Sequence, residues 1–174
     1  AVFMRGGTSK AIIFNRADLP EDRTHWDAIF LAAIGSPDPN GRQLNGMGGG
    51  ISSLSKVCIV EPSDRDDADV NYTFAQISVD RENVGYGANC GNMSSAIGPF
   101  SVDEGLVEAA GDDALVRIYN TNTDKIDSNT VVIVERSLSL DDAVVSDGGG
   151  RTSWPLIANL PWCVLEQSPS SWRT

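Results

Sequence analysis

Two side chains of this sequence could exchange a proton with a substrate, and each belongs to a glycine- and serine-rich stretch. Cys90 lies in GANCGN, directly before a predicted helix whose dipole would favour the thiolate. Lys56 ends the run SSLSK, where an apolar strand begins. Residue chemistry leaves two alternatives open for each. Cys90 is either reactive or a buried inert thiol, and Lys56 is either an acid/base group or a surface lysine with a packed stem.

Three polar clusters contain these residues. They are MRGGTSK (4–10), NGMGGGISSLSK (45–56) and GANCGNMSS (87–95). Glycine permits close backbone approach, and Ser, Thr and Asn add hydrogen-bond donors, so the clusters suit a small anion. The second cluster departs from a phosphate-binding P-loop, because Ser55 precedes Lys56 and Val57 follows it. Carboxylates are therefore favoured over phosphates as ligands.

Apolar patterning predicts the elements that position these clusters. A strand, a Gly-Gly bend and a second strand (Ala11–Phe14) come first, followed by a helix over 20–35. The later predictions are strands over 56–63 and 69–80, a helix over 92–108, and strands over 114–123 and 130–137. The charged run 64–69 is most simply a solvated turn. Cys58, inside VCIV, is predicted to be core, and His25, on the helix, to be either a surface or a packing residue.

Composition limits the classes of function. The formal net charge is −11, from 24 acidic and 13 basic residues, which disfavours nucleic acid and anionic membranes as partners. The 174 residues are 41% apolar, enough for a core. Cys58, Cys90 and Cys163 form no CxxC pair and His25 is the only histidine, which argues against a disulfide framework and a metal site. We expect a cytoplasmic protein with reduced thiols.

The motifs FMRGGTSKAIIF, GMGGGISSLSKVCIVEPS, NCGNMSSAIGPFSVDEGLV and VRIYNTNT together resemble the PrpF family. The resemblance is dense over residues 2–123. It implies an α/β (α+β) fold of the diaminopimelate epimerase-like superfamily, in which each half wraps a mixed sheet around a central helix. It also implies a cofactor-independent isomerase, without a metal, that shifts a double bond or its cis–trans geometry in small unsaturated di- or tricarboxylates such as methylaconitate or aconitate.

The resemblance further implies roles for individual residues. Lys56 and Cys90 match the family's acid/base positions. The implied carboxylate ligands are Arg5, Gly7, Thr8, Ser9, Lys10, Ser52, Ser53, Ser55, Asn89, Gly91, Asn92, Met93 and Asn122. Asn120 is a weaker candidate, and in YNTNT both Asn120 and Asn122 could instead cap a turn.

The resemblance also divides the chain. Residues 1–136 are expected to form the N-terminal epimerase-like domain, and 137–174 a divergent tail that is either aberrant or poorly ordered. Because family members are about twice as long, we expect a homodimer or a partner chain to supply the second half. The alternative is a truncated, non-catalytic remnant that binds a carboxylate or a partner chain. A redox role for Cys90 is disfavoured, because no resolving cysteine lies near it in sequence.

Overall fold

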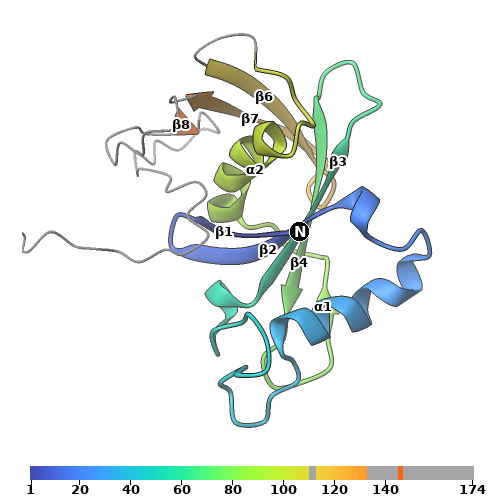
Figure 1. The fold of residues 1–174 in the computed structure, drawn as a ribbon, viewed down its shortest axis with the longest axis vertical. Coiled ribbons are helices and arrows are strands. Elements are labelled where there is room, and N and C mark those ends of the chain that lie inside the picture. The colour runs from blue at the N-terminus through green and yellow to red at the C-terminus, as the bar shows by residue number, and fades with distance from the viewer. Residues whose placement is uncertain (110–112, 133–144, 147–174) are drawn as a thin grey trace, which may run out of the picture.

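A single mixed sheet with two α-helices forms the part of the chain that the structure, a computed structural model, describes: residues 1–109, 113–132 and 145–146 (Figure 1). The strands are β1 (Val2–Gly6), β2 (Ser9–Asn15), β3 (Lys56–Pro62), β4 (Val70–Ile77), β5 (Val84–Gly85), β6 (Asp113–Asn120), β7 (Lys125–Val132) and β8 (Val145–Ser146), and the helices are α1 (Trp26–Ile34) and α2 (Gly91–Asp103). The strand order is β1-β2-β3-β4-β6-β7-β8, with β5 on β4.

The sheet curls around α2, which packs on β1 and β2 at one side and on β6 and β7 at the other (Figure 1). Alternate strand residues face this helix, as the period of two requires. The core comprises Met4, Ala11, Ile13, Cys58, Val60, Val70, Tyr72, Phe74, Val116 and Ile118 from strands and Met93, Ala96, Ile97 and Phe100 from α2. This arrangement confirms the expected half-domain, a mixed sheet wrapped around a central helix.

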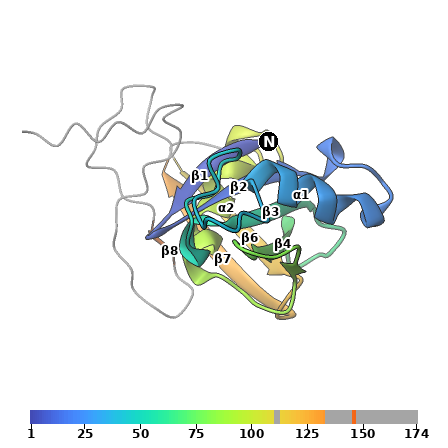
Figure 2. The same ribbon diagram turned by 90° about the horizontal axis from the view of Figure 1, so that it is seen from below.

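The other helix, α1, lies outside the curled sheet (Figure 2). Its Trp26, Phe30 and Ile34 pack on the opposite set of alternating strand residues, among them Ile12 and Val57. Both faces of β2 and β3 are therefore buried, which explains their nearly continuous apolar sequences. Cys58 is core, as predicted, and of the two alternatives for His25 the structure shows the exposed one.

Both helices are shorter than the sequence pattern predicts. The Asp22 carboxylate accepts the Thr24 N–H at 2.9 Å and begins a 3-10 turn, so α1 itself starts only at Trp26. The helix predicted over 92–108 ends at Asp103. Gly105 there has a φ of 69°, and the Leu106 N–H donates to the Ser101 carbonyl at 2.8 Å, which turns the chain back.

The strand predicted over 130–137 begins earlier, at Lys125. It pairs antiparallel with β6 through a tight turn in which Asp124 has a φ of 58°. The sequence KIDSNT carries little apolar signal, and its pairing partner rather than its own composition makes it a strand. Residues 133–137 lie outside the described residues.

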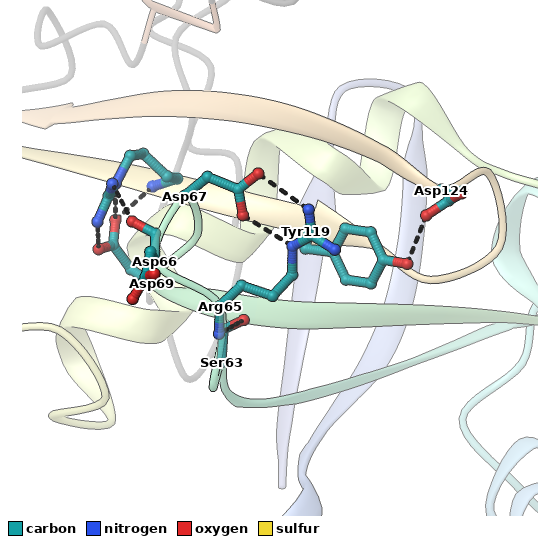
Figure 3. Close-up of polar contacts among 8 residues, drawn as sticks. Ser63, Arg65, Asp66, Asp67, Asp69, Tyr119 and Asp124 are labelled. Carbon is teal, nitrogen blue, oxygen red and sulfur yellow. Dashed lines mark hydrogen bonds and ion pairs between the residues drawn. The ribbon is translucent and has the colours of Figure 1, made fainter.

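The predicted solvated turn over 64–69 also carries a network of ion pairs (Figure 3). Arg65 pairs with Asp67 at 2.7 Å, and its guanidinium lies 4.4 Å from the Tyr119 ring centre. Arg117 pairs with Asp69 at 2.7 Å, and its side-chain hydrogen bonds hold the pKa of Asp69 below its usual range. The turn between β3 and β4 is thereby tied to β6.

Of the predicted tail, 137–174, only β8 is among the described residues. No helix in the described part of the chain is long and apolar enough to cross a membrane.

Candidate functional site

The three polar clusters meet at one end of the sheet. β2 and β3 are parallel and both begin there, while the antiparallel β4 ends there. The first turn of α2 lies over the β1–β2 hairpin at the same end, where Asn92 contacts Thr8. Residues far apart in sequence are thus gathered at the edge of the curled sheet.

Cys90 is the N-cap residue of α2, and its thiol is half-buried and free. The Sγ atom lies 3.7 Å from the hydroxyl oxygen of Ser9, and the Cys90 side chain makes no capping hydrogen bond to the helix. The buried Cys58 differs sharply, because complete burial raises the pKa of its thiol. Between these two cysteines, only Cys90 is placed to react.

Close backbone packing fixes the start of α2 on the hairpin. Asn92 Nδ2 donates to Thr8 Oγ1 at 2.9 Å and lies 3.5 Å from Ser9 Oγ. A Cβ atom on Gly6 would lie 2.2 Å from the Asn92 carbonyl oxygen, so only glycine fits there. Gly7 adopts a φ of 52° at the turn, a conformation that glycine reaches without strain.

The first turn of α2 offers free hydrogen-bond donors beside Cys90. The N–H groups of Met93 and Ser94 both donate to the Cys90 carbonyl, at 3.0 and 3.1 Å. Those of Gly91 and Asn92 have no acceptor among the residues that the structure describes. Such donors at a helix N-terminus suit a carboxylate. Met93 itself is not available, because its side chain is buried and its N–H is used.

Lys56, the other predicted acid/base residue, lies at this end too, and it is only 7% exposed. Its Nζ donates to Gln76 Oε1 at 2.7 Å and lies 5.1 Å from the centre of the Phe74 ring. Gln76 Nε2 donates in turn to the carbonyls of Ser52 and Ser55, at 3.0 and 2.9 Å. Sequence reasoning missed Gln76. The sequence signal for Gln76 was a polar residue at the next alternate position after Tyr72 and Phe74 on the buried face of the strand.

Lys56 and Cys90 approach the same face of the sheet. Lys56 is in register with Ala11, and Ser9, which contacts Cys90, lies two residues before Ala11 on the same side. Strands lie about 4.8 Å apart and rise about 3.3 Å per residue, so the Cα atoms of Ser9 and Lys56 are about 8 Å apart. The two predicted acid/base groups therefore belong to neighbouring positions on one face of the sheet.

Arg5 and Lys10 lie on the other face of the hairpin. They pair with each other in register, alternate with the core residues Met4 and Ala11, and Lys10 Nζ lies 5.0 Å from the Phe3 ring centre. Burial, and secondarily the neighbouring Arg5, lowers the pKa of Lys10. The structure does not bring these two cations together with Cys90 and Lys56.

The serines of the second cluster divide into two kinds. Ser55 is fully buried, and its hydroxyl oxygen lies 2.8 Å from both Gln43 Oε1 and the Ile51 carbonyl oxygen, two acceptors for its one proton. Gln43, a buried residue that sequence reasoning also missed, additionally bonds Ser36 Oγ and the Gly50 N–H. Ser55 therefore supports the loop. Ser52 is exposed and Ser53 is half-buried, so their hydroxyls remain candidates for contact with a ligand.

Asparagines line the remaining side of the site. Asn89 Oδ1 accepts from Asn120 Nδ2 at 2.8 Å and from the Cys90 N–H at 2.7 Å. The Asn122 amide bonds the Phe74 N–H and carbonyl and the Tyr86 carbonyl, which gives it a structural role. Among the described residues, no three His, Cys, Asp or Glu side chains are grouped as a metal would require.

Comparison with known proteins identifies the family. The family model for "PrpF protein" matches residues 1–159, beyond the quoted motifs. The chain belongs to the PrpF family. It is 50% identical over 125 residues to a 4-oxalomesaconate tautomerase of Pseudomonas putida, covering 72% of this chain and 34% of that protein. It is 45% identical over 133 residues to a 2-methyl-aconitate isomerase of Cupriavidus necator, covering 72% and 34%.

The fold of this PrpF chain also matches a solved relative. A crystal structure of a methylitaconate-delta-isomerase superposes with a TM-score of 0.75 at 40% identity, covering 87% of this chain and 39% of that one. The chain thus spans between about a third and two fifths of the length of these relatives.

Proposed function

We propose that this chain provides the acid/base half of an isomerase for a small unsaturated di- or tricarboxylate. One observation carries the proposal: the Lys56 amine and the Cys90 thiol approach one face of the sheet beside the N–H groups of Gly91 and Asn92, which have no acceptor in the described part of the chain. The relatives named above are isomerases or tautomerases of oxalomesaconate, methylaconitate and methylitaconate, which supports this substrate class.

The chemistry requires a proton to leave one carbon of the substrate and another to arrive two carbons away. One of the two groups, in its basic form, removes a proton from the carbon beside the double bond. The electron pair forms a new double bond and places charge on the substrate carboxylate, where the N–H groups of Gly91 and Asn92 can stabilise it. The other group, in its acidic form, returns a proton to the far end of the allylic system.

The arrangement of Lys56 suits this role. Gln76 and the Phe74 ring hold its amine in place without neutralising it, because neither carries a negative charge. Substrate binding and proton transfer are strongest when water is excluded from the site. A further segment of a longer chain, a second copy or a partner would cover the site and exclude water. A cytoplasmic location suits the reduced Cys90 thiol.

The test is proton exchange on trans-aconitate in D2O, followed by 1H NMR. We expect the chain to exchange the methylene protons, and Lys56→Ala and Cys90→Ser each to slow exchange by at least about a hundredfold. Arg65→Ala, which removes a positive charge beyond the other end of β3, is the matched control.

Two other outcomes are informative. Shifts of the Gly91 and Asn92 amide signals with trans-aconitate, without any exchange, would favour the alternative function, a carboxylate-binding remnant. Neither binding nor exchange at millimolar trans-aconitate would contradict both functions.

A further inference from the structure

A hydrogen-bonded chain of three asparagines lies behind Cys90. The Asn122 N–H donates to Asn120 Oδ1 at 3.0 Å, Asn120 Nδ2 donates to Asn89 Oδ1 at 2.8 Å, and Asn89 Oδ1 also accepts the Cys90 N–H at 2.7 Å. The side chain of Asn122 bonds both backbone groups of Phe74 on β4. The chain of bonds therefore runs from the sheet to the backbone of Cys90.

Asn120 is the fixed member of this chain. It is the last residue of β6 and is fully buried. Water therefore could not replace a hydrogen bond that its side-chain amide failed to make. Both ends of the amide are used, Oδ1 by Asn122 and Nδ2 by Asn89. These two bonds settle the orientation of the side chain.

Asn89 and Cys90 have less support of their own. Asn89 is exposed, and residues 86–90 have no regular secondary structure between β5 and α2. Cys90 has an extended backbone, with a φ of −127° and a ψ of 98°, before the helix begins. The side-chain oxygen of Asn89 is the acceptor of the Cys90 N–H, so the position of Asn89 affects the direction of the Cys90 side chain.

We infer that Asn120 is a positioning residue for Cys90, acting through Asn89 and touching no substrate itself. By holding Asn89 Oδ1, it fixes the Cys90 N–H and keeps the thiol beside Ser9 at the start of α2. The catalytic relevance of this role rests on the proposed function of Cys90, whereas the coupling of the three residues does not.

The test is a double-mutant cycle read by hydrogen exchange of the Cys90 amide. Asn89→Ala changes an exposed residue and is expected to speed exchange about fivefold, the effect of one hydrogen bond. Asn120→Ala is expected to do nearly the same. In the Asn89→Ala background, Asn120→Ala should add less than about twofold, because its route to Cys90 is already gone.

A matched control separates positioning from general destabilisation. Asn129 on β7 is likewise a buried asparagine, 1% exposed, but its Oδ1 accepts the Gly98 N–H in the middle of α2. Asn129→Ala should lower resistance to urea as Asn120→Ala does, yet leave Cys90 exchange within about twofold of wild type after correction for global stability.

The thiol gives a second readout. In a Cys163→Ser background, iodoacetamide should modify Cys90 about fivefold faster in Asn120→Ala, because the half-buried thiol is released from its place beside Ser9. Equal effects of the Asn120 and Asn129 variants, or additive effects in the cycle, would overturn the inference. Neither readout uses turnover, so a failure here is distinguishable from a failure of the proposed function.

Discussion

Replacing Gly6 by alanine tests whether the start of α2 rests on the β1–β2 hairpin. The added Cβ would lie 2.2 Å from the Asn92 carbonyl oxygen and 3.0 Å from the Met93 Cα. A carbon–oxygen contact needs about 3.3 Å, so the helix start and the hairpin must separate by about 1 Å. Both neighbours are backbone atoms, so a side-chain rotation cannot relieve the contact. Overpacking of this kind costs about 1–3 kcal/mol.

Urea denaturation and amide NMR measure the two consequences. At about 2 kcal/mol, and with an m-value of about 2 kcal/mol per M, the urea midpoint of Gly6→Ala should fall by about 1 M. The amide signal of Asn92 should also shift, because its bond to Thr8 is strained.

Gly91→Ala is the matched control for Gly6→Ala. A Cβ on Gly91 has nothing within 4 Å, so the midpoint should be unchanged or higher. An unchanged midpoint and an unchanged Asn92 signal in Gly6→Ala would refute the reasoning.

Three further predictions concern the second cluster, the charged turn between β3 and β4, and the core. Gln43→Ala removes three hydrogen bonds around the second cluster and should lower the free energy of unfolding by about 2–3 kcal/mol in urea titrations. The control is Leu44→Ala, at a residue 79% exposed, which should change the free energy of unfolding by less than about 0.5 kcal/mol. Arg117 lowers the pKa of Asp69 in the folded state, so this pair stabilises the fold at pH values above the unfolded-state pKa of about 3.9. This stabilisation is lost as the pH falls through the lower folded-state pKa. Urea titrations from pH 6 to pH 2 should therefore show a steeper loss in wild type than in Asp69→Asn, and equal slopes would contradict this. Cys58, fully buried and with a raised pKa, should resist iodoacetamide in mass spectrometry until urea unfolds the chain, and rapid labelling without urea would contradict its placement.

The sequence predicted the elements that carry strong local patterns. The β-branched run after Lys56 identified β3, and the alternation of Val70, Tyr72 and Phe74 identified β4. The second cluster, before β3, and the third cluster, after β4, both lie where the site forms. The strand β7 was placed too late, because its first residues are polar and only pairing with β6 makes them a strand.

The site itself was only partly predictable, because contacts across strands leave little local trace. Gln76 holds Lys56 from 20 residues away, and nothing next to either residue indicates this partner except the phase of Gln76 in its strand. The opposite difficulty affects Lys10. It is next to Ser9 in sequence, yet adjacent strand residues point to opposite faces, so the structure separates it from Cys90.

The shared face of Lys56 and Cys90 has a stereochemical consequence. Both groups come from the same sheet and helix start, so each would reach a planar allylic anion from the same side. Within the proposed function, we expect the proton to leave and return suprafacially, with the opposite side of the anion facing whatever covers the sheet. In D2O the configuration of the newly deuterated carbon would record which side the proton came from.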